Sequence, residues 1–397
     1  MSLRRVSFLF SVMVLGCLFV MGGQGEYSRA DASDTLTLGF VIPLTGDIPK
    51  VGESSRHAAE MLREEIMALG GLEIGGVKHQ LRFIYEDNES KPESAVMTML
   101  KLIDRDRVLA IVGPQSSKQA VPAGQVANDN RTPMISPWST NPDTTLNRPW
   151  VFRAAFLDPF QAPVAVDFAM EQFGATKAAV LFALANDYSK GLAEFFRNDF
   201  QAKNGAGSVV AYESYGDRDQ DFSAQLTKIL AAQPDVIFLP NNYNEVALIV
   251  RQASDLGWTG PFMGADAWGS AELMTLCGDL CKGHYFSTHY AAAGATGATK
   301  DFIEKYEAKY GYTPDDVAAL TWDATRLVLE AIQSTGGLSG NLRNDRAAIR
   351  DAMAAIEEFD GITGAMRFDD EGDPIKCAVV VKISDAGEFE FAKSVCP

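Results

Sequence analysis

The 397-residue sequence is short of positive charge, with 35 lysines and arginines against 52 aspartates and glutamates and a formal net charge of −17. Nucleic-acid binders need clustered basic side chains to meet the phosphate backbone, so this deficit argues against a nucleic-acid partner. Hydrophobic residues make up 47% and charged residues 22% of the chain, as in an ordinary soluble globular protein. Disorder and a membrane-embedded helix bundle are therefore not expected.

The sequence also lacks the short motifs of common α/β enzymes. No Gly-x-Gly-x-x-Gly follows the first predicted strand, and neither a Gly-Lys-Ser/Thr phosphate loop nor a Gly-x-Ser-x-Gly nucleophile elbow occurs. The adjacent acids Glu86 and Asp87 lie at a predicted strand end, where solvation is a simpler role than catalysis. We therefore predict a protein that is not an enzyme and needs no cofactor.

Long apolar runs are absent except near the N-terminus. Arg4 and Arg5 precede an apolar run over residues 6–20, the pattern of a secretory signal peptide rather than a membrane-spanning helix, which needs about 20 apolar residues. We predict a signal peptide over residues 1–32, cleaved near Ala30-Asp31-Ala32, and an exported protein. The alternative is processing after Val14-Leu15-Gly16, which would attach a lipid anchor to Cys17.

Cysteine and histidine are scarce, with five and four residues in the chain. Four cysteines follow the signal, and an even number in an oxidising compartment favours disulfides. Cys277 and Cys281 are about one helical turn apart, where a bridge is geometrically possible, and Cys377 and Cys396 lie in a strand-rich tail. We expect the pairs Cys277–Cys281 and Cys377–Cys396. A metal site is the alternative, but the histidines show no ligand spacing with these cysteines.

Short apolar runs alternate with amphipathic stretches along the chain. Strands are predicted over 36–42, 80–85, 108–112 and 133–135, with helices over 53–69, 93–103 and 121–128. After Arg153 the pattern restarts, with helices over 161–173, 190–203, 222–232 and 245–256 and strands over 177–182, 208–215, 236–239 and 261–263. Residues 300–356 are predicted mostly helical with a break at Gly336-Gly337, and strands return at 365–368, 377–383 and 388–391.

This alternation predicts an α/β fold of two doubly wound lobes joined by a multi-strand hinge. We assign residues 35–154 and 286–363 to an N-terminal lobe 1, and residues 155–285 and 364–397 to a C-terminal lobe 2. Ligands of open α/β sheets bind outside the carboxyl ends of the strands, so two facing lobes predict a binding cleft between them.

Several short segments together carry a resemblance to a known family. They are Val41-Ile42-Pro43-Leu44-Thr45-Gly46, Gly70-Gly71, Ile111-Val112-Gly113-Pro114 with Ser116-Ser117, Met263-Gly264-Ala265-Asp266, Gly361-Ile362-Thr363-Gly364 and Phe368-Asp369. In this order over the mature chain, they resemble the leucine/isoleucine/valine-binding protein family, the type I periplasmic solute receptors of ABC importers. The resemblance implies a monomeric periplasmic receptor that closes on a small-molecule amino acid and serves the membrane subunits of an importer. The alternative function is sensory binding of an amide, a urea or an aromatic acid.

The resemblance also implies ligand contacts in both lobes. Ser117 begins a helix, whose free N–H groups suit a carboxylate; alternatively it is an ordinary helix cap. In the loop Trp138-Ser139-Thr140, the backbone of Trp138 and the hydroxyl of Thr140 would hold the ligand's carboxylate and ammonium, although Trp138 stands where the family usually has a small residue. Tyr188 and Tyr243 would close over the ligand from lobe 2, or else pack at a domain surface.

Asp266 matches the family's acidic partner of the α-ammonium group. A carboxylate in a closing cleft is costly unless a cation meets it, so this residue favours an amine-bearing ligand; alternatively, it caps a helix near Ser270. Val51, Gln115 and Trp268 are expected to line the pocket for the ligand's side chain. Leucine-like ligands follow from the family, while the tryptophans and the glutamine leave aromatic and polar amino acids open.

Overall fold

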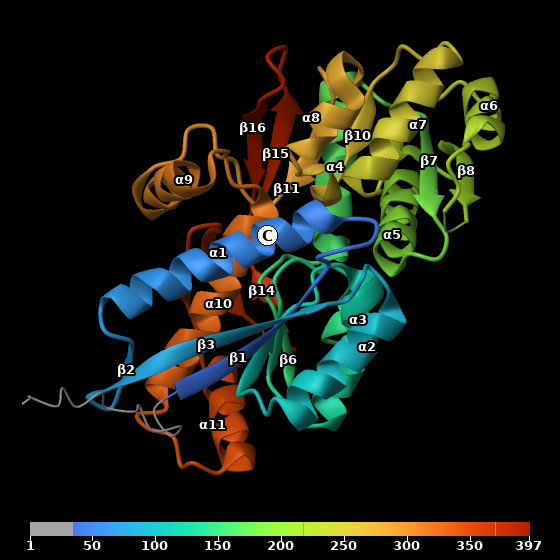
Figure 1. The fold of residues 1–397 in the computed structure, drawn as a ribbon. Coiled ribbons are helices and arrows are strands. Elements are labelled where there is room, and N and C mark those ends of the chain that lie inside the picture. The colour runs from blue at the N-terminus through green and yellow to red at the C-terminus, as the bar shows by residue number, and fades with distance from the viewer. Residues whose placement is uncertain (1–34, 217, 370) are drawn as a thin grey trace, which may run out of the picture.

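The computed structural model describes residues 35–216, 218–369 and 371–397 as two α/β lobes (Figure 1). The predicted signal peptide, its cleavage sites and Cys17 lie outside the described residues. In the part of the chain that is described, none of the helices combines the length and apolar character needed to cross a bilayer.

Lobe 1 is built on a six-stranded sheet in the order β2-β3-β1-β4-β5-β6. Its strands are β1 (Thr35–Ile42), β2 (Leu72–Ile74), β3 (Val77–Asp87), β4 (Ala110–Val112), β5 (Met134–Ser136) and β6 (Val151–Arg153). All neighbours pair in parallel except β2, which runs antiparallel to β3. Because β1 is covered on both sides, the alternating residues Phe40 and Val41 are buried in two separate apolar clusters.

Helices cover both faces of this sheet. α2 (Pro92–Leu100) and α3 (Ser117–Asp129) pack on the face that contains Val41, while α1 (Pro49–Ala68) and α10 (Asp316–Ser334) contact each other on the other face. α11 (Leu342–Ala354) lies against α10, and its Arg346 donates hydrogen bonds to the carbonyl of Val108. Lobe 1 is therefore completed by helices from the last quarter of the sequence, as the blue and orange ribbons of Figure 1 show.

Lobe 2 contains a seven-stranded sheet in the order β16-β15-β11-β10-β9-β7-β8. The strands are β7 (Ala178–Ala183), β8 (Val209–Tyr215), β9 (Val236–Leu239), β10 (Phe262–Gly264), β11 (Tyr285–Thr288), β15 (Ala378–Ile383) and β16 (Phe389–Val395). The helices are α4 (Asp158–Phe173), α5 (Asp187–Asn204), α6 (Ser223–Ala231), α7 (Tyr243–Asp255) and α8 (Glu272–Cys277). The strands β7 to β11 are parallel to one another, while β15 and β16 add an antiparallel edge next to β11.

The chain passes between the lobes after β6, after β11 and before β15. β11 is hydrogen-bonded in the lobe 2 sheet, so the expected boundary between residues 285 and 286 falls inside this strand. The boundary between residues 363 and 364 likewise separates β12 (Phe359–Gly361) from its partner β13 (Gly364–Phe368), which also pairs with β14 (Pro374–Ile375). We propose that the second and third crossings lie after Thr288 and at Lys376. α9 (Gly297–Tyr310) follows the second crossing and contacts α1.

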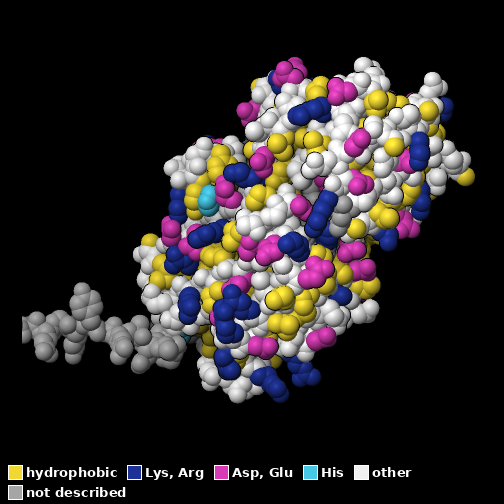
Figure 2. Space-filling view, turned by 45° about the vertical axis from the view of Figure 1, so that its right-hand side comes forward, with side chains coloured by type: hydrophobic (Ala, Val, Ile, Leu, Met, Phe, Trp, Pro, Cys, Tyr) yellow, Lys and Arg dark blue, Asp and Glu magenta, His cyan; other side chains and the backbone are white. Residues whose placement is uncertain are grey.

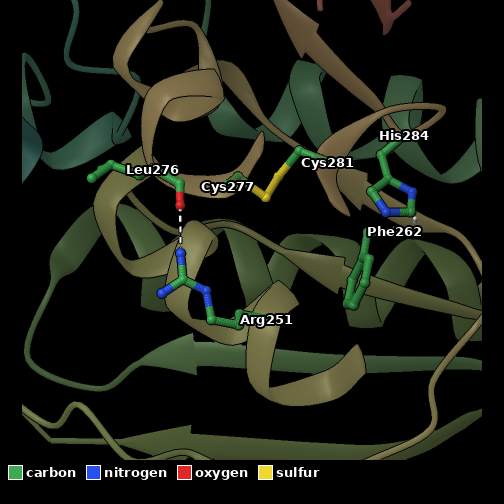
Figure 3. The surroundings of a disulfide bond; sticks show 6 residues. All are labelled: Arg251, Phe262, Leu276, Cys277, Cys281 and His284. Carbon is green, nitrogen blue, oxygen red and sulfur yellow. Dashed lines mark hydrogen bonds between the residues drawn. A yellow bond between two sulfur atoms is a disulfide. The ribbon is translucent and has the colours of Figure 1, made fainter. Parts of the chain in front are cut away.

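Both expected disulfides are present. Cys277–Cys281 joins the end of α8 to the following turn, where Arg251 of α7 donates a 2.7 Å hydrogen bond to the carbonyl of Leu276 (Figure 3). Cys377–Cys396 joins the chain next to the paired residues Ala378 and Val395 of β15 and β16. The first bridge therefore holds a local turn, and the second fastens the edge of the lobe 2 sheet.

Charged side chains of both signs are spread over both lobes on the face that Figure 2 shows. Many of them form exposed ion pairs, such as Lys305 with Glu65 and Lys393 with Glu171. Such pairs contribute little individually to stability because solvent screens them. The acidic excess of the sequence is thus carried by a mixed, solvated surface.

Candidate functional site

The loops at the carboxyl ends of strands from both sheets meet at one place between the lobes. Residues following β4 and β5 come from lobe 1, and residues following β7, β9 and β10 come from lobe 2. They enclose a small cavity of about 10 Å³, lined by Ser116, Ser117, Trp138, Tyr188, Asn242, Asp266 and Ala267. Four of the seven ligand contacts expected from the sequence therefore line a single cavity.

Ser117 is the first residue of α3 and is buried at the lobe 1 side of this cavity. Its Oγ lies 2.8 Å from the Oγ of Ser139, and the backbone N–H of Asn141 donates to it over 3.4 Å. The start of α3 presents the positive end of the helix dipole. This corner of the site is suited to a carboxylate.

The loop after β5 forms the neighbouring wall. Trp138 is buried, and its indole Nε1 donates a 3.1 Å hydrogen bond to Oδ2 of Asp316 at the start of α10. Ser139 is held through its carbonyl by Arg153, whose Nη1 lies 2.9 Å away. Thr140 is fully buried. Burial raises the pKa of the neighbouring Asp158, and a hydrogen bond from the Thr140 hydroxyl opposes this effect. A hydroxyl that donates to a carboxyl group keeps an acceptor lone pair that a ligand N–H can use.

Asp266 faces these groups from lobe 2, where a 3-10 turn follows β10. It is 1% exposed, and its Oδ1 accepts hydrogen bonds from Tyr188 Oη at 2.7 Å and from Gln161 Nε2 at 2.8 Å. His289 Nε2 lies 3.5 Å from Oδ2, but burial lowers the pKa of His289 even though the nearby Asp266 carboxylate opposes this effect.

No lysine or arginine among the described residues forms an ion pair with Asp266. The neutral donors Tyr188 and Gln161 satisfy its hydrogen-bonding capacity in part, but they leave its charge unmatched. A buried charge without an opposite charge is unfavourable, so a cationic group bound at this position would stabilise the site.

Two further buried acids lie close to Asp266. The pKa of Asp158 is raised to about 8, mainly by burial and also by the Asp266 carboxylate, while the Thr140 hydrogen bond and Arg153 act in the opposite direction. Burial likewise raises the pKa of Asp316 well above its usual value, with contributions from Asp315 and Asp266. Both shifts favour the neutral carboxyl form of these two residues.

The other residues expected at the site are buried but do not line this cavity. Tyr243 begins α7 beside the lining residue Asn242, Val51 lies in the first turn of α1, and Gln115 donates to Thr321 over 3.5 Å. Trp268 donates its Nε1 to the carbonyl of Leu239, and its ring lies against Gly264, where a Cβ would approach within 2.4 Å. The structure therefore gives Trp268 a packing role.

Sequence reasoning missed Gln161, Asn242, His289 and Asp316. Asn242 carries a detectable signal, because Asn242 and Glu245 form a capping box at the start of α7. The other three have no local motif. They reach the site only because α4, the second crossing and α10 meet beside β10 and β5.

A larger cleft of about 820 Å³ adjoins the cavity at Ser116 and Asn242. Its lining is mostly polar and includes Thr45, Glu89, Lys118, Asn186, Asn242 and Glu245. Burial raises the pKa of Glu245 to about 7.

Comparison with known proteins identifies the class of this two-lobed architecture. The model of the periplasmic binding protein family matches residues 35–388, which is nearly all of the described chain. The chain belongs to the periplasmic binding protein family. Members of this family are solute receptors rather than enzymes, and the two lobes with a site between them are those of a type I periplasmic binding protein.

Individual members of the family resemble this periplasmic binding protein over most of their length. The leucine-, isoleucine-, valine-, threonine- and alanine-binding protein of Pseudomonas aeruginosa is 28% identical over 372 residues, covering 93% of each chain. A leucine-binding protein from Thermotoga maritima is 32% identical with a TM-score of 0.83, covering 91% of this chain and 99% of its own.

A branched-chain amino-acid receptor from Streptococcus pneumoniae, solved with isoleucine, is 30% identical with a TM-score of 0.82, covering 91% of this chain and 100% of its own. A Rhodopseudomonas palustris receptor solved with benzoate is 21% identical with a TM-score of 0.80, covering 91% of this chain and 97% of its own, and shows the shared fold alone.

Proposed function

We propose that this protein is the non-catalytic receptor of an ABC amino-acid importer, and that it binds one α-amino acid between its lobes. The observation that carries the proposal is the pairing of Ser117 and Asp266 across one cavity. The first lies at a helix N-terminus suited to a carboxylate, and the second is a buried carboxylate suited to an ammonium group. An α-amino acid carries both groups on one carbon atom.

In the proposed complex, lobe 1 holds the carboxylate of the ligand, and both lobes contact its ammonium group. The start of α3 and the loop from Trp138 to Thr140 bind the carboxylate, while Asp266 and the Thr140 hydroxyl bind the ammonium group. Tyr188 stays bonded to Asp266 and shields it, and Tyr243 supports the neighbouring start of α7. Because the closed form makes contacts that the open form lacks, ligand shifts the population toward closure.

The identity of the amino acid is proposed from the relatives, which are named for leucine, isoleucine, valine, threonine and alanine. The polar cleft beside Asn242 favours the smaller or more polar members of this group, because it offers few apolar side chains to a large aliphatic one. Aromatic acids are the alternative ligand class, since the benzoate receptor shares the fold. Asp266 favours the amine-bearing class, because it forms no ion pair with a lysine or arginine of the described residues.

We further propose that the receptor works as a monomer in the periplasm and delivers its ligand to the membrane subunits of an importer. Export is indicated by Arg4, Arg5 and the apolar run that follows. Lipid attachment at Cys17 remains the alternative form of the mature protein. Mass spectrometry of protein purified from the producing cell distinguishes an acylated Cys17 from cleavage near Ala32.

The test is a titration of the purified protein with amino acids, amides and benzoate, followed by calorimetry and tryptophan fluorescence. We expect binding of α-amino acids, and we expect Asp266→Ala to abolish it with little loss of folding stability, because the charge partner of the ammonium group is removed. Asp301→Ala, at an exposed position, is the matched control and should bind normally. Binding of benzoate and of no amino acid would refute the proposed role of Asp266.

A further inference from the structure

Arg153 is the last residue of β6, immediately before the first crossing between the lobes, and it is 0% exposed. Its Nε donates a 2.5 Å hydrogen bond to Oδ1 of Asp373, which is also buried. Asp373 directly precedes β14, on the segment that leads to the third crossing. The first and third crossings are therefore joined by a buried ion pair.

The same guanidinium group reaches the ligand-facing loop. Nη1 donates to the carbonyl of Ser139 over 2.9 Å, and Nη2 donates to the hydroxyl of Thr145 over 2.6 Å. The Thr145 hydroxyl also donates to Oδ1 of Asp373 over 2.8 Å, so the three side chains form a closed triangle. The hydroxyl of Ser139 lies 2.8 Å from the hydroxyl of Ser117, so fixing Ser139 also restrains the side chain of Ser117.

The backbone strengthens this connection. The N–H of Arg153 donates to the carbonyl of Gly372, and Nζ of Lys376 donates to the Thr363 hydroxyl at 2.6 Å and to the carbonyl of Ala154 at 3.4 Å. Thr363 is in turn held by Asp323 of α10. The first and third crossings and the loop after β5 are thus fixed to one another by buried groups.

We propose that Arg153, held by Asp373 and Thr145, is a positioning residue for ligand binding. It fixes the carbonyl of Ser139 and so sets the orientation in which the loop from Trp138 to Thr140 meets the ligand. It also makes this loop move as one unit with the first and third crossings. This inference rests on the proposed function, because it assigns a role in the binding of the same amino acid.

The mechanism requires the forked geometry of arginine rather than charge alone. A lysine at position 153 would keep the charge for Asp373, but a single ammonium group cannot reach Asp373, Ser139 and Thr145 in one plane. The loop would then sample orientations that do not contact the ligand. Ordering the loop on binding would cost conformational entropy and weaken the affinity. The expected loss is in affinity rather than in the overall fold.

The experiment measures the dissociation constants of L-leucine and L-alanine by calorimetry, together with thermal midpoints, for the unaltered protein and five variants. We expect Arg153→Lys and Asp373→Asn to weaken binding of the better ligand at least tenfold, and Thr145→Val to weaken it less. The double variant Arg153→Lys/Asp373→Asn should lose little more than either single variant, because both changes break one connection. Dissociation should become faster in each case.

Arg346→Lys is the matched control, since Arg346 is a buried arginine that binds the carbonyls of Val108 and Ile103 away from the site. It should lower the thermal midpoint and leave affinity unchanged. The inference is overturned if Arg153→Lys and Thr145→Val bind as tightly as the unaltered protein, or if Arg346→Lys loses as much affinity as Arg153→Lys. Absence of binding by the unaltered protein would instead overturn the proposed function, and this inference with it.

Discussion

At the scale of single residues, the site is defined by an unusual density of buried acid. Asp158, Asp266 and Asp316 are all nearly inaccessible, yet the groups that approach Asp266 are the neutral Tyr188 and Gln161 and a histidine whose pKa burial lowers. Three ionised carboxylates this close would repel one another strongly. Burial, together with the nearby Asp266 carboxylate, raises the pKa of Asp158 and of Asp316, which favours their neutral forms and reduces this repulsion.

Asp158 therefore makes stability depend on pH. Its pKa of about 8 in the folded protein exceeds the usual value of 3.8, so between these values the folded state binds a proton that the unfolded state lacks. Stability contributed by this group is present below about pH 4 and is lost as pH rises toward 8, at up to ~1.4 kcal/mol per pH unit. We expect Asp158→Asn to flatten the decline in the free energy of unfolding between pH 5 and 8.

Chemical denaturation at several pH values measures this slope. The exposed substitution Asp301→Asn should leave it unchanged. An Asp158→Asn variant with the same pH dependence as the unaltered protein would show that Asp158 is ionised in the folded state.

At the scale of elements, the sequence predicts those helices and strands whose apolar pattern extends over several turns or several strand residues. The amphipathic patterns of α1, α5 and α7 and the continuous apolar runs of β7 and β9 place these elements correctly. Five strands of two to four residues were missed: β2, β6, β11, β12 and β14. So few residues show no period, and the equally short β4, β5 and β10 were predicted because each follows a predicted helix in the βαβ alternation. The missed strands exist because neighbouring strands offer hydrogen-bond partners, which is a tertiary effect.

The same reasoning explains which site residues were found. Ser117, Trp138, Tyr188 and Asp266 were predicted from the family resemblance, and each follows a predicted strand, as expected for a site at the carboxyl ends of a parallel sheet. Asp316 and His289 enter from a helix start and from a crossing, and their distance from β10 depends on how the lobes are joined. No local pattern encodes that distance.

The two disulfides close loops of very different length, with sequence separations of 4 and 19. In the chain-entropy treatment, the short loop stabilises by about 2 kcal/mol and the longer one by about 3 kcal/mol. We expect the double variant Cys377→Ser/Cys396→Ser to lower the thermal midpoint more than Cys277→Ser/Cys281→Ser, because it also releases the edge strand β16. Calorimetric melting of both variants tests this ranking, and equal or reversed losses would contradict it.

At the scale of the whole molecule, binding depends on how the lobes meet. Asn141 follows the lobe 1 loop of the site, and its Nδ2 donates a 2.8 Å hydrogen bond to the carbonyl of Asp187 in α5 of lobe 2. Its Oδ1 has a separate role, because it accepts from the N–H of Asp143 and caps a short turn. The side chain of Asn141 thus caps a turn within lobe 1 and also forms a hydrogen bond between the lobes.

Asn141→Asp separates these two roles, since aspartate keeps the capping acceptor and loses the donor. We expect this variant to fold normally and to bind the amino acid several-fold more weakly, as the loss of about 1 kcal/mol from a single hydrogen bond implies. Small-angle scattering without ligand should show a larger average radius of gyration. Asn130→Asp, which loses a 2.8 Å bond within lobe 1, is the control; an equal loss of affinity there would exclude a specific role for the contact between lobes.

The position of α10 and α11 late in the sequence affects how the protein folds during its synthesis. These helices cover the six-stranded sheet of lobe 1, which comes from residues 35–153, and they are synthesised only after the five parallel strands of lobe 2. A chain that emerges from its N-terminus would expose the apolar face of the lobe 1 sheet, including Leu38 and Phe40, for most of its synthesis. Both lobes therefore depend on C-terminal segments, since β15 and β16 of lobe 2 follow α11, and contacts between such distant segments make folding slow. We expect the nascent chain to stay open long enough to pass through an export channel unfolded.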